Sequence, residues 1–440
     1  MKNPLKKKDF AEAGALYFIA TLFNKGIGFV TVPIFSRILT TSDYGTVTTF
    51  NSWVSMISVF ISLALYNAVR NSFVDMDDKE RPHFLSTIIT FTGLVFLTVI
   101  GVCVVVTVFV PRNINTALIF MCIIQSFGYA LINDYSYYLM MHYRYRFRAA
   151  LMVLPGLLSV VLSIFAILFI LKDNLYLGRI VPTTAVYGVF AIVVLIAVYS
   201  KTKPELNLEY LKYGLKIALP LVLHSIALQI LSQSDRVMIT SLRNAAETGV
   251  YSLVYNLSMI ATVITTSLDG IWVPWFTGKL KERKIREINV LAMDYVHLMT
   301  YAMVALILVG PEILKIFADQ RYWEGMSIIP PIALANYMIF MYTMYVYIEH
   351  YYKKTVYITK NTLIAAGLNV ILNYILIPKY GYVAAAYTTL ASYFVAFILH
   401  SRYAKTIEPD IYPFKMFALP LLHVGGAIIL YYPLLNFWTL

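Results

Sequence analysis

Residues 213–242 read YGLKIALPLVLHSIALQILSQSDRVMITSL, and residues 248–276 read TGVYSLVYNLSMIATVITTSLDGIWVPWF. Both stretches have the length and apolarity of membrane-spanning helices, yet they contain Asp235, Arg236 and Asp269. The polar residues of each helix recur at spacings of three or four and therefore share one face. They are Ser225, Gln229, Ser232 and Arg236 on the first helix, and Tyr255, Ser258, Thr262, Thr265, Asp269 and Trp272 on the second. Charge within a membrane is costly unless it faces protein or water, so we interpret the pair as one wall of a hydrated cavity.

The composition of the whole chain is that of an integral membrane protein. Of its 440 residues, 60% are hydrophobic and 13% are charged, and the mean hydropathy is +0.71. Apolar runs long enough to cross a bilayer recur from end to end. We expect spans at 10–38, 45–69, 83–110, 115–141, 149–171, 181–199, 213–241, 248–276, 287–317, 326–352, 361–377, 382–401 and 414–435.

The net charge of +12 reports membrane orientation, and a nucleic-acid partner is not needed to explain it. Most of the Lys and Arg residues fall in the amino terminus and in alternate loops, so the amino terminus is expected to be cytoplasmic. Cys103 and Cys122 lie in apolar runs, and the His residues lack ligand spacing, so no metal site is predicted. The run after Lys8 is too long for a signal peptide and is expected to remain as the first helix.

Asn24 and Lys25 lie near the middle of this first span. At 1.5 Å per residue, the lysine is roughly 20 Å from either end, too far to reach the membrane surface. Its ammonium group must therefore be met inside the protein. An ion pair between helices and a cation that faces a ligand both remain open.

Two further spans carry polar residues. The second span has a stripe of Asn51, Ser55, Ser58, Ser62 and Tyr66, which beside Lys25 indicates cavity lining. The fourth span contains Asp134, for which pairing with a neighbouring helix and a functional role remain open.

The polar stretch 201–212 divides the chain into halves with similar features. We predict an N-terminal lobe at 1–200, a cytoplasmic linker at 201–212, a C-terminal lobe at 213–403 and an extra span within 404–440. Asn244-Ala-Ala-Glu-Thr-Gly249 occupies the place in its half that Thr41-Ser-Asp-Tyr-Gly45 occupies in the first. With six spans per half, the halves would be parallel repeats. The end at Leu440 is compatible with a missing fourteenth helix.

Three short sequence elements follow one another along the chain: Ser36-Arg-Ile-Leu-Thr-x-x-Asp-Tyr-Gly, Ser234-Asp-Arg236 with Glu247-Thr-Gly-Val-Tyr251, and Pro378-x-Tyr-Gly-x-x-x-Ala. In these elements, in span number and in loop brevity, the chain resembles bacterial polysaccharide (Wzx-type) flippases. That family shares a superfamily with multidrug extrusion (MATE) transporters and lipid II flippases. The resemblance implies an all-α membrane protein of two six-helix lobes forming a V around a central cationic cavity.

The resemblance also implies a cargo: an undecaprenyl-diphosphate-linked oligosaccharide that moves from the cytoplasmic to the outer leaflet of the bacterial inner membrane. Lys25 and Arg236 would meet the diphosphate, and Asn24, Gln229, Ser232, Ser58 and Ser62 would line the cavity. Arg236 lies near the outer end of its helix, which leaves outward snorkelling or an outer gate open for it. The chain would act as a monomer, alongside polymerase and export machinery.

The energy source is expected to be an ion gradient and not a cofactor. The sequence has no P-loop, which argues against ATP. A proton or sodium gradient supplies about 2.3 kcal/mol per charge per 100 mV. Asp269, Asp134 and Asp235 are the candidate coupling carboxylates.

Two alternatives have different signatures. A MATE-like exporter of cationic drugs should line its cavity with acidic residues, whereas the deepest charge here is Lys25. A membrane polymerase or glycosyltransferase usually needs a large loop or a cluster of acid and base residues. The loops here are short, so we expect a transporter and not an enzyme.

Overall fold

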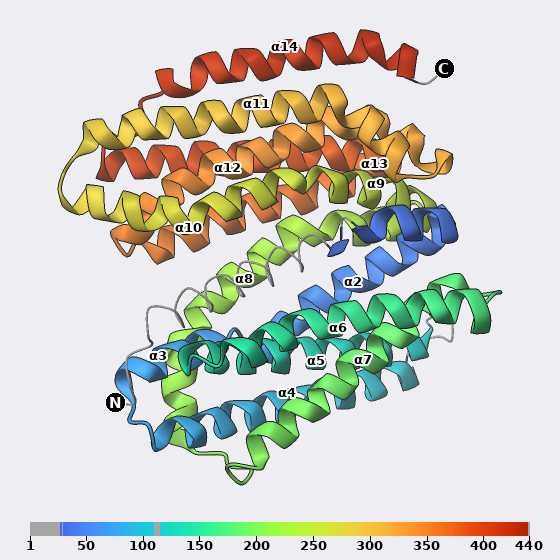
Figure 1. Cartoon of the computed structure of the whole chain (residues 1–440), viewed down its shortest axis with the longest axis vertical. Helices are drawn as coiled ribbons and strands as arrows, with labels where there is room; N and C mark the ends of the chain where they lie inside the picture. The colour runs from blue at the N-terminus through green and yellow to red at the C-terminus, as the bar shows by residue number, and fades with distance from the viewer. Residues whose placement is uncertain (1–26, 29, 110–114, 439–440) are drawn as a thin grey trace. The chain divides into compact units, whose positions relative to one another are not determined.

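Every regular element in the described part of the chain is a helix, as the hydropathy predicts. The computed structural model describes residues 27, 28, 30–109 and 115–438 (Figure 1). It divides into two compact units. Unit 1 comprises Met1–Thr31 and Phe50–Gln229, and unit 2 comprises Val32–Thr49 and Ile230–Leu440. Ten of the described helical segments are long and apolar enough to cross a membrane, which confirms the predicted all-helical membrane fold.

The first helices build mainly unit 1. They are α2 (Thr41–Ser62), α3 (Tyr66–Asp75), α4 (Glu80–Phe109), α5 (Thr116–Met141), α6 (Tyr145–Phe165), the π-helix η1 (Ala166–Ile170), α7 (Leu175–Tyr199) and α8 (Leu208–Leu242). Helices α2 and α8 each contribute residues to both units. Helix α5 packs against α3, α4, α6 and α7 around a core of Leu, Ile, Val and Phe side chains. Leu97, Val102 and Ile196 remain exposed on α4 and α7, as on helices that face lipid.

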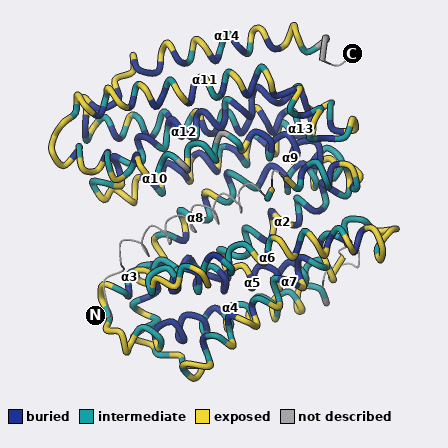
Figure 2. Tube along the Cα trace, viewed as in Figure 1, coloured by how far each residue is buried: buried dark blue, intermediate teal, exposed yellow. Residues whose placement is uncertain are grey.

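The remaining helices build unit 2. They are α9 (Ala245–Ser258), α10 (Ile260–Lys281), α11 (Ile285–Phe317), the 3₁₀ helix η2 (Gln320–Ile328), α12 (Ile329–Tyr351), α13 (Thr355–Ile407) and α14 (Lys415–Trp438). Helix α12 packs along α13 and against α11. The most apolar window of the Gln320–Tyr351 segment is 78% buried, against 22% for that of Lys415–Leu435. Helix α12 is therefore central to unit 2 and α14 peripheral, as the colours of Figure 2 also show.

The two predicted spans at 361–377 and 382–401 are the two halves of α13. Gly381 separates them with φ +63°, and a Cβ there would lie 2.4 Å from Glu247 Oε2. Only glycine fits this backbone easily, because other residues rarely adopt a positive φ. The Pro378-x-Tyr-Gly381 element is therefore the turn that the sequence predicts, and it folds the second half back along the first.

The predicted second span is interrupted and forms α2 and α3. Leu63 and Ala64 have φ values of 45° and 52°, which are unusual for residues with a side chain. The Ser62 hydroxyl accepts a hydrogen bond from the Ala64 N–H at 3.3 Å and replaces a helical bond. The interruption starts a new helix N-terminus at Tyr66, within unit 1.

The two similar segments that end in Gly45 and Gly249 lie at the starts of α2 and α9, and they pack against each other within unit 2. A Cβ on Gly45 would lie 1.7 Å from the Ala245 carbonyl oxygen, and one on Gly249 would lie 2.0 Å from the Thr41 carbonyl oxygen. Thr41 and Ala245 are the first residues of α2 and α9. The contact is therefore reciprocal, and neither position has room for a side chain.

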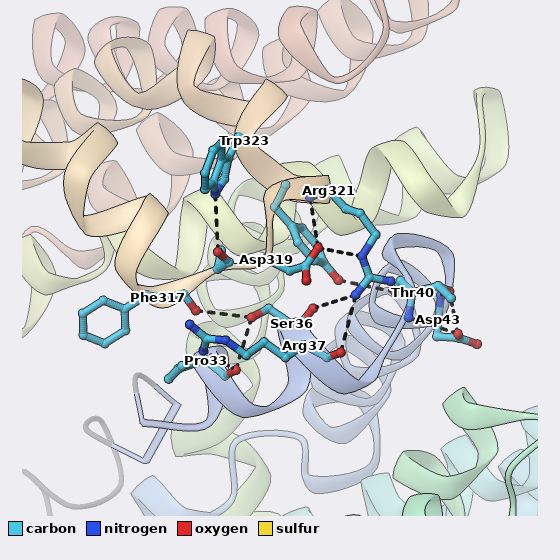
Figure 3. Close-up of polar contacts among 11 residues, drawn as sticks. Pro33, Ser36, Arg37, Thr40, Asp43, Phe317, Asp319, Arg321 and Trp323 are labelled. Atoms are coloured by element: carbon cyan, nitrogen blue, oxygen red, sulfur yellow. Dashed lines mark hydrogen bonds and ion pairs between the residues drawn. The ribbon is translucent and has the colours of Figure 1, made fainter. Parts of the chain in front are cut away.

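A second set of polar contacts ties residues 33–43 to the segment that joins α11 to η2 (Figure 3). Ser36 Oγ donates to the Phe317 carbonyl at 3.2 Å, and Arg37 Nη2 donates to the Ile316 carbonyl at 2.9 Å. Arg321 binds Asp319 Oδ1 through Nε at 2.7 Å and reaches the Ser36 carbonyl through Nη2 at 3.4 Å. These bonds and the glycine contact hold residues 33–49 within unit 2.

Candidate functional site

Asp235 is the centre of the densest polar cluster in unit 2. Its side chain is completely buried and accepts three hydrogen bonds. Tyr251 Oη and Thr389 Oγ1 each donate to Oδ2 at 2.6 Å, and Asn373 Nδ2 donates to Oδ1 at 2.7 Å. Three donors replace much of the hydration that a buried carboxylate loses. The cluster is therefore built to hold a negative charge inside the membrane.

A second layer of amides and hydroxyls supports these donors. Asn373 Nδ2 also contacts Asn369 Oδ1 at 3.1 Å, and the Thr388 hydroxyl donates to Asn373 Oδ1. Ser234 Oγ donates to Asn369 Oδ1 at 2.9 Å. A half-turn of the Asn373 amide would exchange its nitrogen for an oxygen beside Asp235. The same residues can thus offer donors to a bare carboxylate or oxygen ligands to a small cation.

Local sequence explains how four separate segments meet at this point. Asn244 caps α9, because its side chain accepts the Glu247 N–H at 2.8 Å, and Gly249 lets this helix approach closely. Helix α9 carries Tyr251, seven residues or about two turns beyond Asn244. The break at Gly381 folds α13 back, so the two asparagines of its first half face the Thr388–Thr389 pair of its second half.

Arg236, next to Asp235, is also buried, with 5% of its surface exposed. Its Nη1 donates to the Ser232 carbonyl at 2.8 Å and contacts Gln233 Oε1 at 3.4 Å. The guanidinium carbon lies 4.5 Å from the centre of the Tyr255 ring, a cation–π contact. In the described part of the chain, no carboxylate forms an ion pair with Arg236. Among the described residues, Arg236 is therefore a buried cation without an ion pair, next in sequence to the carboxylate of Asp235.

The other predicted cavity residues lie in several places. Asn24 and Lys25 fall outside the described residues. Ser58 donates to the Ser55 carbonyl at 2.8 Å within α2, and Ser62 is buried at the α2–α3 interruption. Gln229 and Ser232 are half-buried on α8, and the Ser232 carbonyl accepts from Arg236. The structure thus brings Ser232 and Arg236 together and places Ser58 and Ser62 in the part of α2 that belongs to unit 1.

The other two candidate carboxylates have different surroundings. Asp134, on α5 of unit 1, is completely buried, and neither of its oxygens accepts a hydrogen bond in the described part of the structure. The Thr92 hydroxyl and the Tyr66 backbone amide at the start of α3 are its polar neighbours. Asp269, on α10 of unit 2, is half-buried and interacts with the Tyr347 hydroxyl.

The partners of Asp235 escaped the sequence analysis. Asn369 and Asn373 are four residues apart within an apolar stretch, and Thr388 and Thr389 follow the next turn. Amides on one face of a membrane helix were a usable signal, because they need a partner there. Because this region carries no charge between Lys360 and Lys379, hydropathy alone predicts a plain membrane span here.

Among the described residues, no group of three or more His, Cys, Asp or Glu side chains could hold a metal. A cation beside Asp235 would therefore have one carboxylate and several neutral oxygens as ligands. Such a donor set suits a hard monovalent ion or a proton better than a transition metal.

The long apolar helices of both units define a multi-pass membrane protein, and solved structures share its fold. The chain is similar in fold to the lipid II flippase MurJ in an inward closed conformation, with a TM-score of 0.73 and 16% identity over 96% of this chain and 92% of that one. It is also similar to an inward-facing MATE family multidrug transporter of the MOP superfamily, with a TM-score of 0.60 and 14% identity over 90% of this chain and 99% of that one. For a Vibrio cholerae MATE transporter the TM-score is 0.58 and the identity 12%, over 92% of this chain and 100% of that one.

Sequence comparison gives the family. Residues 10–278, more than half of the chain, match the family described as polysaccharide biosynthesis protein, and the chain belongs to that family. A protein of the Lsg locus of Haemophilus influenzae is 20% identical over 282 residues, which cover 61% of this chain and 66% of that protein. The predicted membership of a polysaccharide biosynthesis family is thereby confirmed, and so is the predicted likeness in fold to lipid II flippases and MATE transporters.

Proposed function

We propose that this protein moves a lipid-linked oligosaccharide, carried on undecaprenyl diphosphate, from the cytoplasmic to the outer leaflet of a bacterial inner membrane. Membership of the polysaccharide biosynthesis family supports the glycan. The likeness in fold to a lipid II flippase and to MATE transporters supports transport by alternating access. We expect a monomer with a cytoplasmic amino terminus, which passes its cargo to polymerase and export machinery.

The observation that carries the proposal is the buried guanidinium of Arg236. A diphosphate and many hydroxyls are costly to move through hydrocarbon, and fixed cations offset the lost hydration of the phosphates. Among the described residues, Arg236 forms no ion pair. Its guanidinium donates to Ser232 and Gln233 and packs on the ring of Tyr255. An anionic group would find in it a cation not yet committed to a carboxylate. Lys25 is proposed as the second cation for the same cargo.

The driving force would be a proton or sodium gradient. Asp235 is the strongest of the three candidate carboxylates, because hydroxyls and amides that can also serve as cation ligands already surround it. Asp134 and Asp269 are secondary candidates. Occupation of the Asp235 cluster by a cation would remove the charge that balances Arg236. The cluster can in this way link ion binding to the affinity of Arg236 for phosphate.

The test uses a bacterium that lacks its own repeat-unit flippase, with surface polysaccharide as the readout and matched membrane levels of each variant. We expect Lys25→Ala and Arg236→Ala to abolish display, with lipid-linked sugar accumulating in the inner leaflet. The variants Lys25→Arg and Arg236→Lys should retain part of the surface display, because they keep the positive charge. Lys415→Ala, on α14, is the control and should display normally. Normal display by both alanine variants at the two proposed sites would overturn the cationic-site proposal.

Export of small cationic molecules is the second candidate, favoured by the likeness to MATE transporters. It predicts drug resistance in cells that express the chain, without restoration of polysaccharide display. The buried Arg236 argues against a cationic cargo, because like charges repel in a medium of low dielectric constant.

A further inference from the structure

A second pair of ionisable side chains is buried in unit 2, away from Asp235. His400, on the second half of α13, places Nδ1 2.8 Å from Oε2 of Glu349 on α12. The two side chains are 1% and 0% exposed. Carboxylates and imidazoles are rarely buried to this degree without a specific reason, because desolvation penalises their charged forms.

The pair is only half satisfied. Glu349 Oε1 and His400 Nε2 are both buried, and neither has a hydrogen-bond partner in the described part of the chain. A purely structural ion pair repays its desolvation only if further hydrogen bonds satisfy the remaining atoms. Here two atoms that can bind or release a proton are left open.

The pair is separate from the Asp235 cluster. On α13, His400 lies eleven residues after Thr389, a partner of Asp235, which is about 16 Å at 1.5 Å per residue. Glu349 lies two residues before the end of α12 at Tyr351. This end of unit 2 also carries Lys353 and Lys354, and the charge bias predicts it to be cytoplasmic.

The surroundings of the pair are aromatic on both helices that carry it. The Tyr342 ring on α12 stacks on His400 at 5.5 Å between centroids. His350 on α12 interacts electrostatically with His400, and Tyr403 on α13 does so with Glu349. No second ion pair to either residue occurs among the described residues. In such a medium the pair is most stable when its net charge is zero, which requires one proton more than a carboxylate beside a neutral imidazole carries.

We propose that His400 and Glu349 form a proton-binding site of unit 2 that is distinct from the Asp235 cluster. In the state of net charge −1, the Nδ1–H of neutral His400 donates to Oε2 of the Glu349 carboxylate. One proton, taken from water, binds one of the two open atoms, His400 Nε2 or Glu349 Oε1, and brings the net charge of the pair to zero. Loss of that proton restores the charged state. The site itself does not depend on the proposed cargo; only its role in driving transport does.

A row of tyrosines leads from this site towards Asp235. Tyr342 stacks on Tyr393 with centroids 6.1 Å apart and planes 7° apart, and Tyr393 interacts with Tyr255. Tyr255 lies under Arg236 and beside Tyr251, the donor to Asp235. Within unit 2, protonation of the pair can therefore alter the Asp235 cluster through packed side chains.

The test is a pH titration of the purified full chain in lipid nanodiscs, followed by infrared spectroscopy of carboxyl and imidazole bands. In the wild type we expect one difference band of the pair, in the carboxyl or imidazole region, to change with pH. This change should be absent in Glu349→Gln and shifted by about one pH unit or more in His400→Gln. Glu408→Gln is the matched control, because Glu408 pairs with Arg283 at the same end of unit 2 and should leave that band unchanged.

The double variant Glu349→Gln/His400→Gln guards against misfolding, because two amides can replace the pair without charge. It should elute as the wild type and lack the titrating band. If Glu349→Gln keeps the wild-type difference spectrum, the proposal is wrong. A titrating band in a protein that fails to restore polysaccharide display would refute the proposed cargo and leave the proton site standing.

Discussion

Asp134 in unit 1 and Asp235 in unit 2 are both completely buried aspartates on membrane helices, yet their surroundings are opposite. Asp235 accepts three hydrogen bonds from Tyr251, Thr389 and Asn373. Asp134 accepts none from the described residues. Donors offset the lost hydration of the first carboxyl group, whereas no described residue does this for the second. Burial alone therefore does not tell what a membrane carboxylate does; the number of donors aimed at it does.

Asp235→Ala should have the largest effect on stability. It leaves a buried tyrosine hydroxyl, a threonine hydroxyl and an amide without their acceptor and removes the charge that balances Arg236. We expect the free energy of unfolding to fall by about 3–5 kcal/mol. Denaturation by SDS in mixed micelles, followed by tryptophan fluorescence, measures this change. A loss below about 1 kcal/mol would show that the donors are not committed to Asp235.

Gly249→Ala should have the second-largest effect on stability, because it displaces α9, which carries Tyr251. The new Cβ would lie 2.0 Å from the Thr41 carbonyl oxygen, so one backbone must move. We expect a loss of about 1–3 kcal/mol in the same unfolding measurement. Gly270→Ala is the matched control, since no described atom outside the nearby backbone of its own helix lies within 4 Å of the new Cβ, and it should be neutral or slightly stabilising. Equal effects at the two glycines would contradict the close contact.

Asp134→Asn should cost far less than the change at Asp235. No donor among the described residues loses a bonded acceptor, and an amide of the same shape carries no charge to bury. We expect a change within about 1 kcal/mol of the wild type. The informative comparison is with Asp235→Asn under identical conditions. A larger loss at Asp134 than at Asp235 would reverse the contrast between the units.

Acidification should produce the smallest effect, at Asp319 between α11 and η2. Hydrogen bonds from Arg321 hold the pKa of this carboxyl below its ordinary value. The contribution of Asp319 to stability is therefore fully present above the ordinary aspartate pKa and is lost as the pH falls through the lower, folded-state pKa. Trp323 donates to the Ala318 carbonyl beside it and can report this change by fluorescence. Asp319→Asn should abolish that pH-dependent signal and leave the neutral-pH spectrum close to wild type.

Much of the fold could be predicted because hydropathy fixes helices locally. The expected spans at 115–141 and 287–317 agree with α5 (Thr116–Met141) and α11 (Ile285–Phe317) nearly to the residue. The interruption between α2 and α3 could not be predicted. Leu63 and Ala64 are ordinary helix formers, and only tertiary packing imposes their positive φ.

The candidate site could be predicted only in part. Asp235 and Arg236 stood out because charge is rare in an apolar stretch. The contact of Asp235 with Asn373 and Thr389 joins residues far apart in the chain and depends on the turn at Gly381. Periodicity within one helix reports which residues share a face. It does not report which other helix that face will meet.

The reciprocal contact of Gly45 and Gly249 sets a rule for recombining this chain with its relatives. Each glycine packs against the first residue of the other helix. Residues 41–49 and 245–249 should therefore be exchanged together, although they are far apart in the sequence. A chimera that takes only one of the two segments from a relative would pair it with a backbone that it does not match. Crossovers that keep both segments from the same parent should give folded hybrids.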